Sequence, residues 1–326
     1  MKVKAIRFAK PGAASVMKWQ DVEVGNPRAG EALVRHTAIG LNYIDTYHRT
    51  GLYPLPLPAG IGLEAAGVVE KVGRGVKHVK PGDRVAYAGG PPGAYSEARV
   101  MPADPLVKIP PKVSDEQAAA MMLKGMTVEY LIQRTYKVKK GETILWHAAA
   151  GGVGLIAGQW AKAIGAIAIG TAGGPAKCRL AKAHGFAHVI DYNKKKDFAK
   201  EVRRITKGKG VPVVYDPVGK STFAGSLDCL APRGLLASFG NASGPVPPFE
   251  PGMLAAKGSL YFTRPTLMSY NATRKELEAS ARALFRLVGS GKIKIEINQT
   301  YALKDAVKAH RDLEGRKTTG STILIP

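Results

Sequence analysis

The chain has 326 residues, 45% of them hydrophobic, and its 48 Lys and Arg against 25 Asp and Glu give a formal net charge of +23. This length and apolar content predict two domains with sizeable cores. No stretch of about 18 consecutive apolar residues is present, so we expect no transmembrane helix and no membrane partner.

The positive charge predicts an attraction for anions, which include a dinucleotide phosphate, nucleic acid and an acidic membrane surface. Its densest stretch lies between Lys194 and Lys209, and we interpret it as a solvated helix face. The two cysteines, Cys178 and Cys229, are expected to be free thiols in a reducing compartment. Although the net charge would attract nucleic acid, no recognition motif accompanies it, so nucleic-acid binding is kept only as a side activity.

The first 125 or so residues are predicted to be rich in β-strands. Met1 to Ile6 alternates polar and apolar residues, which is typical of a strand and not of a signal peptide, so a cytoplasmic protein is expected. Turn signals separate the following short apolar runs, as at Pro81-Gly82-Asp83 and Gly89-Gly90. From about Lys139 the pattern changes.

Strands and helices then alternate with short connections. The predicted strands are 143–147, 166–170, 187–190, 211–215 and 235–239, and the predicted helices are 152–164, 175–184, 197–206 and 221–230. Such alternation indicates a parallel, doubly wound α/β sheet. The remainder is predicted to hold an amphipathic helix at 275–290 and a strand at 321–325.

A glycine-rich turn joins the first of these strands to the first helix. Its residues follow the G-x-G-x-x-G pattern as Ala149, Gly151 and Gly154, with Gly152 and Val153 between the last two. Gly151 would let the backbone approach a pyrophosphate, and Gly154 would let the helix pack closely on the strand. The helix N-terminus would supply N–H groups to the phosphates. Because the required strand, turn and helix are all predicted, the motif indicates a dinucleotide site.

The end of the next strand indicates which dinucleotide binds. An NAD enzyme usually carries Asp or Glu there to hold the ribose 2′-hydroxyl, but this chain has Gly173 and Gly174. Lys177 and Arg179 follow, where they would pair with a 2′-phosphate. Tyr192, just after the third strand, is placed to pack near the adenine. The sequence therefore favours NADPH.

Together these segments resemble the quinone oxidoreductases of the zeta-crystallin type, within the medium-chain dehydrogenase/reductase superfamily. The resemblance spans nearly the whole chain. It is carried by the segments 38–47 (AIGLNYIDTY), 62–67 (GLEAAG), 80–85 (KPGDRV), 147–154 (HAAAGGVG), 214–219 (VYDPVG), 238–241 (SFGN) and 263–265 (TRP).

The resemblance implies the domain organisation. A GroES-like, β-rich catalytic domain would comprise residues 1–125 and 266–326, and a Rossmann domain binding NADPH would comprise residues 126–265. The active site would lie in a cleft between them. By the same resemblance the last strand of the cofactor sheet, near Ser259 to Thr263, would pair with its twin in a homodimer. An open apolar edge there would be an aggregation risk.

The resemblance also gives a contrast with the zinc-dependent alcohol dehydrogenases of the superfamily. Those enzymes have Cys where this chain has Asn42 and His where it has Leu63, and they carry a four-cysteine lobe. Catalytic zinc needs three protein ligands and structural zinc needs four. We therefore expect no metal, little alcohol oxidation, and reduction of an acceptor that is already electrophilic.

The site residues follow from the resemblance. Catalytic roles beside the quinone are implied for Asn42, Tyr47, Tyr53 and Arg264, with Tyr43 in the same pocket. Cofactor contacts are implied for Asn42, Thr127, Gly151, Gly152, Val153, Gly154, Gly173, Lys177, Tyr192, Phe239, Gly240, Asn241 and Arg316. The choice between Arg316 and Lys317 stays open. Arg264 is also a candidate to touch the cofactor, His147 is interpreted as a packing residue, and Glu64 lies in a segment that looks structural.

We therefore predict a zinc-independent NADPH:quinone oxidoreductase. The alternative enzyme is an NADPH-dependent alkenal or enone reductase, because the same zinc-free scaffold serves both reactions. The sequence names neither the physiological acceptor nor the number of electrons that move in each step.

Overall fold

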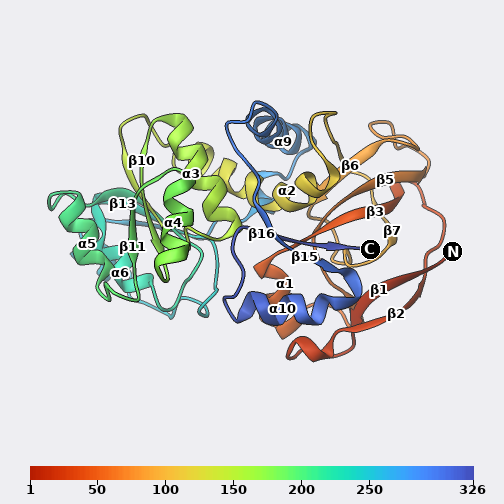
Figure 1. Ribbon diagram of the computed structural model, residues 1–326, viewed down its shortest axis with the longest axis horizontal. Coiled ribbons are helices and arrows are strands. Elements are labelled where there is room, and N and C mark those ends of the chain that lie inside the picture. The colour runs from red at the N-terminus through yellow and green to blue at the C-terminus, as the bar shows by residue number, and fades with distance from the viewer. The chain divides into compact units, whose positions relative to one another are not determined.

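The computed structural model describes all 326 residues and divides the chain into two compact units. Unit 1 consists of Met1–Met126, Asn271–Gly289 and Ile295–Pro326, and unit 2 of Thr127–Tyr270 and Ser290–Lys294. Figure 1 shows that the chain begins in unit 1, builds the parallel sheet of unit 2 in green and cyan, and returns to unit 1 in blue. The mixed α/β fold that the sequence predicted is confirmed.

Unit 1 is built on two sheets. The smaller sheet has the antiparallel order β2-β1-β4, and the larger has the order β15-β16-β3-β5-β6-β8, with β7 also paired to β3. All its pairs are antiparallel except β15 with β16. The strands are β1 (Lys2–Phe8), β2 (Lys18–Glu23), β3 (Glu31–Leu41), β4 (Ala59–Gly60), β5 (Glu64–Val72), β6 (Arg84–Ala88), β7 (Ala98–Pro102), β8 (Val107–Lys108), β15 (Ile297–Ala302) and β16 (Ser321–Ile325).

Four helices accompany these sheets. They are α1 (Tyr43–Thr50), α2 (Asp115–Tyr130), α9 (Arg274–Gly289) and α10 (Ala306–Glu314), together with the 3₁₀ turns Ala14–Val16 and Leu303–Asp305. The periodicity of the sequence did not predict α2. Its middle, from Ala118 to Met122, is buried on every side, so the helix has no polar stripe that would give an amphipathic pattern. A π-helical turn, Leu131–Thr135, follows its last residue.

Unit 2 contains a six-stranded parallel sheet in the order β11-β10-β9-β12-β13-β14. Numbered from its first strand, this order is 3-2-1-4-5-6, which is the arrangement of dinucleotide-binding sheets. The strands are β9 (Thr143–Trp146), β10 (Ile167–Ala172), β11 (Phe186–Asp191), β12 (Val211–Asp216), β13 (Leu230–Ser238) and β14 (Tyr261–Thr263). The helices are α3 (Gly152–Ile164), α4 (Pro175–Ala183), α5 (Phe198–Ile205), α6 (Phe223–Asp228), α7 (Gly252–Ala256) and α8 (Leu267–Tyr270).

The predicted strands and helices of this sheet are all present, and the largest boundary difference lies around Leu230. The predicted helix 221–230 ends at Asp228, and the strand expected from Leu235 begins at Leu230. Pairing with β12 is irregular there, since Val211 faces Leu230 whereas Val213 already faces Leu235. Pro232 and Gly234 interrupt the apolar pattern within β13, which hides the first half of this strand from a periodicity analysis.

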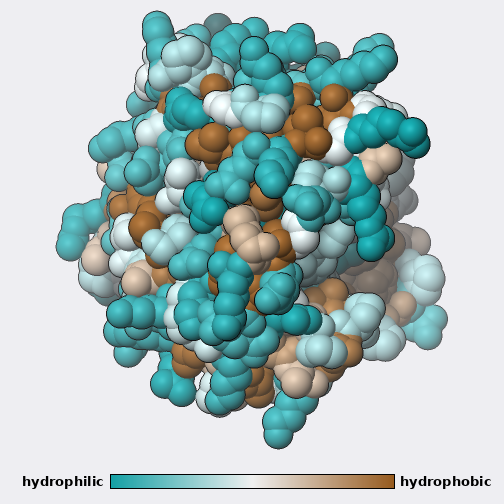
Figure 2. Space-filling view, turned by 90° about the vertical axis from the view of Figure 1, so that its right-hand side faces the viewer, coloured by the Kyte–Doolittle hydropathy of each residue, from teal (hydrophilic) through white to brown (hydrophobic).

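One face of the molecule is mostly hydrophilic (Figure 2). Figure 2 shows the side of the molecule on which β1 and β2 lie in Figure 1, where hydrophilic side chains dominate and apolar ones form small separate groups. No helix is long and apolar enough to cross a membrane.

Candidate active site

The glycine-rich turn lies between β9 and α3, at the point where the strand order of the unit 2 sheet reverses. Gly151 is the N-cap of α3, and its N–H donates to the carbonyl of Ala148 at 3.0 Å. Ala148 itself has a left-handed conformation with φ of 55°. The N–H groups at the start of α3 are therefore free of side-chain caps and face the place where ligands bind in such sheets.

Gly154 fits the close approach of α3 to β9 that the motif requires. A Cβ atom at this position would lie 2.5 Å from the carbonyl oxygen of Ala148 and 2.6 Å from that of Ala149. Both contacts are with backbone, which cannot rotate away. The residue types in the turn therefore suit a pyrophosphate held by backbone N–H groups.

The ends of β10 and β11 form the neighbouring part of this edge. The hydroxyl of Tyr192 lies so near Gly173 that a Cβ there would be 2.6 Å from it. Asp191 is the acid closest in sequence to this turn, and its Oδ1 already accepts from the N–H groups of Gly174 at 2.9 Å and Asn193 at 3.0 Å. Lys177 lies half-buried in the first turn of α4. The basic side chain of Lys177 therefore follows shortly after the glycine turn Gly173-Gly174.

The ends of β12 and β13 complete the edge. Phe239 packs against Trp146 with ring centroids 5.6 Å apart, and a Cβ at Gly240 would lie 2.3 Å from the carbonyl oxygen of Pro217. Nη1 of Arg264 donates to the carbonyl of Ser238 at 2.9 Å. Arg264 thus belongs to the cofactor edge of unit 2, whereas the tyrosines predicted to share its pocket belong to unit 1.

His147, just after β9, is fully buried below this edge. Its Nδ1 lies 2.9 Å from the hydroxyl of Thr171 and its Nε2 lies 3.0 Å from that of Ser226. Burial lowers the pKa of His147. These contacts support its interpretation as a packing residue that ties β9, β10 and α6 together.

In unit 1, Asn42 belongs to a buried polar cluster that the sequence did not reveal. Its Nδ2 donates to Oε2 of Glu64 at 2.7 Å, and Nζ of Lys124 lies 3.1 Å from the same oxygen. Oε1 of Glu64 accepts from the N–H of Leu123 at 2.7 Å. Glu64 is fully buried and Lys124 is 6% exposed. The cluster therefore fixes the Asn42 amide and one carboxylate against the start of α1.

Gly40 makes room for this carboxylate. A Cβ atom at Gly40 would lie 2.2 Å from Oε2 of Glu64 and 2.2 Å from the carbonyl oxygen of Ala119. The glycine in β3 and the glutamate in β5 are therefore a matched pair. Glu64 was assigned to a segment that looks structural, and its contacts make it the positioning partner of Asn42.

Three tyrosines lie next to this cluster on and after α1. The ring of Tyr47 packs edge-on against Tyr43 at 5.6 Å and against Tyr53 at 5.2 Å. Tyr47 is buried, whereas Tyr43 and Tyr53 are half-buried. The structure therefore brings Tyr47, Tyr53 and Tyr43 together, as the resemblance implied for an aromatic wall.

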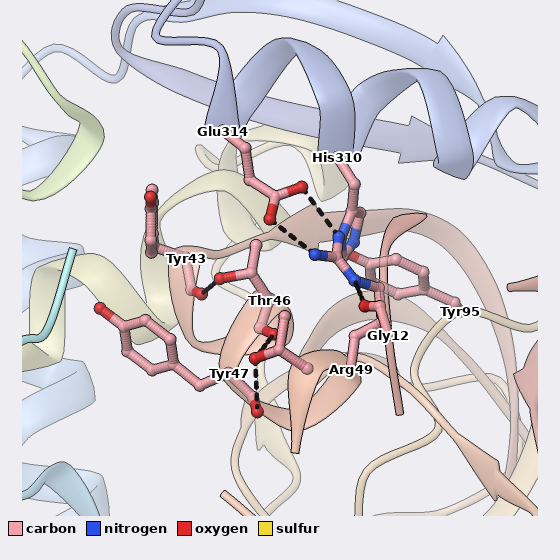
Figure 3. A network of polar contacts seen from close by, with 9 residues as sticks. Gly12, Tyr43, Thr46, Tyr47, Arg49, Tyr95, His310 and Glu314 are labelled. Atoms are coloured by element: carbon pink, nitrogen blue, oxygen red, sulfur yellow. Dashed lines mark hydrogen bonds and ion pairs between the residues drawn. The ribbon is translucent and has the colours of Figure 1, made fainter. Parts of the chain in front are cut away.

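A buried polar network holds α1 against α10 (Figure 3). Arg49 is 1% exposed, and its guanidinium meets both carboxylate oxygens of Glu314 at 2.6 and 3.0 Å. Nη1 of Arg49 also donates to Nδ1 of His310 at 3.0 Å, and Nε donates to the carbonyl of Gly12 at 3.0 Å. Arg has only donors, so Nδ1 of His310 must be the acceptor and Nε2 must carry the proton.

The network continues from His310 to Asp45. Nε2 of His310 lies 3.1 Å from the hydroxyl of Tyr95, which donates to Oδ2 of Asp45 at 2.9 Å. The N–H of Asn42 donates to the same oxygen at 2.9 Å. Burial raises the pKa of Asp45 to about 7, and burial lowers the pKa of His310 to about 3. Asn42 at the N-cap with Asp45 three residues later is a capping pattern, the one signal in the sequence for this network.

Arg316 lies in unit 1, directly after α10, while the other residues predicted for the adenosine end lie in unit 2. Burial raises the pKa of Tyr43, Glu314 raises it further, and the charge of Arg316 lowers it. Lys317 instead lies 3.7 Å from Asp312. Of the two adjacent cations, Arg316 is thus the one whose charge acts on Tyr43 of α1.

Thr127 is buried in the last turns of α2, where unit 2 begins. Leu63 is buried beside Glu64. No group of three or more His, Cys, Asp or Glu side chains is arranged to hold a metal ion.

Comparison with known proteins identifies the family. Residues 28–111 match the family described as alcohol dehydrogenase GroES-like domain, and residues 152–283 match the zinc-binding dehydrogenase family. A quinone oxidoreductase of Pseudomonas aeruginosa is 56% identical over 99% of both chains, and quinone oxidoreductase 1 of Escherichia coli is 51% identical over 98% of this chain and 99% of the relative.

Solved structures agree with the sequence relatives. The E. coli quinone oxidoreductase complexed with NADPH has a TM-score of 0.97 at 51% identity, covering 99% of this chain and 100% of the other. A 2-haloacrylate reductase structure has a TM-score of 0.88 at 44% identity, covering 99% of each chain. The resemblance stated from the sequence is confirmed, and the chain belongs to the quinone oxidoreductase family of the medium-chain dehydrogenase/reductase superfamily.

Proposed function

We propose that this protein is a zinc-independent NADPH:quinone oxidoreductase. The observation that carries the proposal is the Gly151–Gly154 turn at the reversal point of the parallel sheet, next to a β10 end that has glycine and lysine where an acid would select NAD. Relatives at 51–56% identity are named quinone oxidoreductases, and E. coli and mycobacterial structures are complexes with NADPH. These relatives support the cofactor that the sequence favoured.

In this proposal, unit 2 holds the cofactor. Gly151, Gly152, Val153 and Gly154 bind the pyrophosphate, and Gly173, Lys177 and Tyr192 bind the adenosine with its 2′-phosphate. Thr127 and the turn Phe239, Gly240 and Asn241 border the nicotinamide, together with Asn42. Arg316 remains a candidate for the phosphate end. Bound NADPH supplies a hydride, and these residues orient it.

The acceptor pocket is proposed around Tyr47 and Tyr53. Flat rings pack well against aromatic walls, and a tyrosine hydroxyl can donate to the oxygen that becomes negative when a quinone is reduced. Asn42, held by Glu64, supplies a second fixed donor. Arg264 is proposed at the cofactor side of the pocket, since its guanidinium binds the Ser238 carbonyl at the end of β13.

The second candidate is reduction of an activated alkene. A 2-haloacrylate reductase of a Burkholderia species is 44% identical over 99% of both chains, so its name gives this alternative a specific basis. The relatives with higher identity that carry the name quinone oxidoreductase favour the quinone.

A side-by-side turnover series tests the proposal. The purified protein is assayed with NADPH against a benzoquinone, an α,β-enone and 2-chloroacrylate, and with NADP⁺ against ethanol. Fast NADPH consumption with the quinone and almost none with the other substrates is expected. Robust alcohol oxidation without quinone turnover would overturn the proposal, and faster turnover of the alkenes would establish the second candidate. Activity that disappears on chelation and returns with zinc would contradict the metal-free mechanism.

We also propose a homodimer formed along β14. This strand pairs with β13 on one side only, and its Tyr261 is 62% exposed. An open strand edge with exposed aromatic surface favours pairing with a copy of itself across a two-fold axis. Light scattering at micromolar concentration should report twice the mass of the chain, and Tyr261→Lys should shift it toward the monomer. A monomeric parent protein would refute this interface.

A further inference from the structure

Unit 1 contains a cavity that has no part in the proposed reaction. Its volume is about 900 Å³, and it lies between α9 and the segment that runs from Val107 to Val113. Every residue that lines it belongs to unit 1. The glycine-rich turn belongs to unit 2, and none of the tyrosines around α1 contributes to the cavity wall. The cavity is therefore distinct from the candidate active site.

One wall of the cavity is a row of charged side chains on α9. Arg274, Glu278, Arg282 and Arg286 follow one another at four-residue spacing, which places them along one side of the helix, and all four line the cavity. Arg274 is satisfied, because it forms an ion pair with Glu278 at 2.7 Å and donates to the carbonyl of Leu106. Glu278 has its pKa lowered first by Arg274 and also by the charge of Arg282, so Arg282 shares this carboxylate without a direct ion pair, whereas Arg286 has no carboxylate partner.

The facing wall adds further positive charge. Lys108 is paired with Asp83 at 2.8 Å, whereas Lys112 has no partner. Three cations, Arg282, Arg286 and Lys112, therefore face a cavity whose one carboxylate, Glu278, is already paired with Arg274. Like charges four residues apart destabilise a helix, so an anion between Arg282 and Arg286 would relieve a repulsion that Glu278 compensates only in part.

The floor of the cavity is apolar. Val113 and Phe285 are buried beneath it, and Pro110 and Pro111 border it. Proline and phenylalanine surfaces offer contact area but no donors, so a hydrated inorganic ion would leave this floor unused. A cavity with a cationic rim and an apolar floor suits a ligand with both kinds of surface.

We propose that this cavity binds an amphipathic organic anion, in which two or more sulfonate, carboxylate or phosphate groups are attached to a flat apolar body. The anionic groups would lie between Arg282, Arg286 and Lys112, and the apolar body would lie against Phe285 and the two prolines. The proposal is independent of the acceptor that the enzyme reduces. It also gives part of the +23 net charge a specific role.

Binding in this cavity would also affect the end of α2, because α9 packs against it. Leu284 packs so closely against Gly125 that a Cβ on the glycine would lie 2.5 Å from its methyl groups. Leu284 belongs to the same helix as the two arginines. A ligand that holds α9 in place would therefore raise the thermal unfolding temperature of the protein.

The test uses a disulfonated bis-anilinonaphthalene dye, whose fluorescence rises on an apolar surface, added to the full protein saturated with NADP⁺. One variant is the double substitution Arg282→Gln and Arg286→Gln. The matched control is Lys275→Gln with Arg28→Gln, which removes the same two charges from exposed positions outside the cavity, one of them on the same helix. A small naphthalene disulfonate and a single-stranded oligonucleotide are titrated as competitors.

The expected result is one dye site in the presence of NADP⁺, with affinity weakened roughly tenfold or more in the double variant and less than about twofold in the control. The unfolding temperature should rise with dye in the parent and control proteins but not in the double variant. Equal dye affinity in all three proteins, or loss of binding when NADP⁺ is added, would overturn the proposal. So would displacement by the oligonucleotide at lower concentration than by a small disulfonate, because the cavity would then be part of a nucleic-acid surface.

Discussion

The candidate site residues of the two units differ in kind: those of unit 2 act mainly through the backbone, and those of unit 1 through side chains. In unit 2 the site consists mostly of backbone, with glycines at Gly151, Gly154 and Gly240 where a Cβ would crowd or block the approach. In unit 1 the site consists of side chains from distant segments, such as Asn42, Glu64 and Lys124. A backbone site tolerates few residue types at a few adjacent positions. A side-chain site depends on contacts that only the folded sheet creates.

This difference predicts where each unit is fragile. A buried charge that loses its partner costs several kcal/mol, whereas an extra methyl group at a close approach costs less stability and acts mainly on binding. Substitutions in the unit 1 site should therefore act mainly by lowering the stability of the fold. Substitutions in the unit 2 site should act mainly by weakening cofactor binding.

The largest effect is expected for Glu64→Gln in unit 1. The substitution leaves the buried Lys124 ammonium without its carboxylate, which should lower the free energy of unfolding by about 3–5 kcal/mol. Denaturant unfolding followed by circular dichroism measures the change. The double variant Glu64→Gln with Lys124→Met should recover much of the loss, because no buried charge remains. Unfolding of the single variant at the parent's midpoint would show that the pair is not a stabilising unit.

Acid should also weaken unit 1. Burial lowers the pKa of His36 to about 4 and of His310 to about 3, so the unfolded chain binds these protons first and stability falls as the pH drops below 6.5. Asp45, with a pKa raised to about 7, opposes this, because the folded chain holds its proton as the pH falls. Burial also lowers the pKa of His48 and His147, so the buried histidines outnumber Asp45. Each excess proton bound by the unfolded chain costs about 1.4 kcal/mol per pH unit between pH 6.5 and 4.5.

Unfolding titrations at a series of pH values measure this slope. His310→Gln removes one of these buried histidines, so the slope should fall by about 1.4 kcal/mol per pH unit. A parent protein that gains stability as the pH falls through this range would contradict the assignment of neutral, buried histidines.

In unit 2 the corresponding change is Gly154→Ala. The added methyl group meets two backbone carbonyls, so α3 must shift, at a cost of about 1–3 kcal/mol. We expect NADPH affinity to fall by about tenfold or more while the secondary structure is kept. Gly252→Ala is the control, since its Cβ would meet nothing within 4 Å. Isothermal titration with NADPH should separate the two, and equal affinities would remove Gly154 from the site.

Lys177→Ala should narrow the preference for NADPH over NADH. A charge-assisted hydrogen bond contributes about 1.5–3 kcal/mol, and the half-buried position favours the lower limit, roughly tenfold. Lys182→Ala, an exposed lysine later in the same helix, is the matched control. The ratio of kcat/KM for the two cofactors is the measurement. Equal use of both cofactors by the parent would show that no 2′-phosphate site exists here.

The smallest effect is expected for Tyr53→Phe. Removing one donor to a quinone oxygen should cost about 1–2 kcal/mol of transition-state stabilisation, which is measured as a lower kcat/KM for the quinone. This cost is smaller than at a strong oxyanion site. The KM for NADPH should stay unchanged, because the residue belongs to the acceptor pocket. Tyr301→Phe, in β15 and outside the proposed acceptor pocket, controls for the loss of a hydroxyl. A change confined to the NADPH KM would assign Tyr53 to the cofactor instead.

The same contrast explains what the sequence could predict. The alternation of strands and helices and the spacing of Gly151 and Gly154 are local patterns, so the unit 2 sheet and its turn were predicted. The network from Arg49 to His310 joins residues more than 250 positions apart in the chain, and no local pattern connects them. α2 was missed for a physical reason of its own, since a helix buried on all sides has no amphipathic period.

The pairing of β16 with β3 has a consequence for the order of synthesis. Ile323 lies opposite Gly40 and Leu324 opposite Ile39, so the large sheet of unit 1 closes only after residues 321–325 have left the ribosome. All six strands of the parallel sheet are synthesised earlier and can pair at once. During that time the edge of β3 that β16 covers in the finished sheet remains exposed. The unit that starts first in the chain is therefore the one that finishes last.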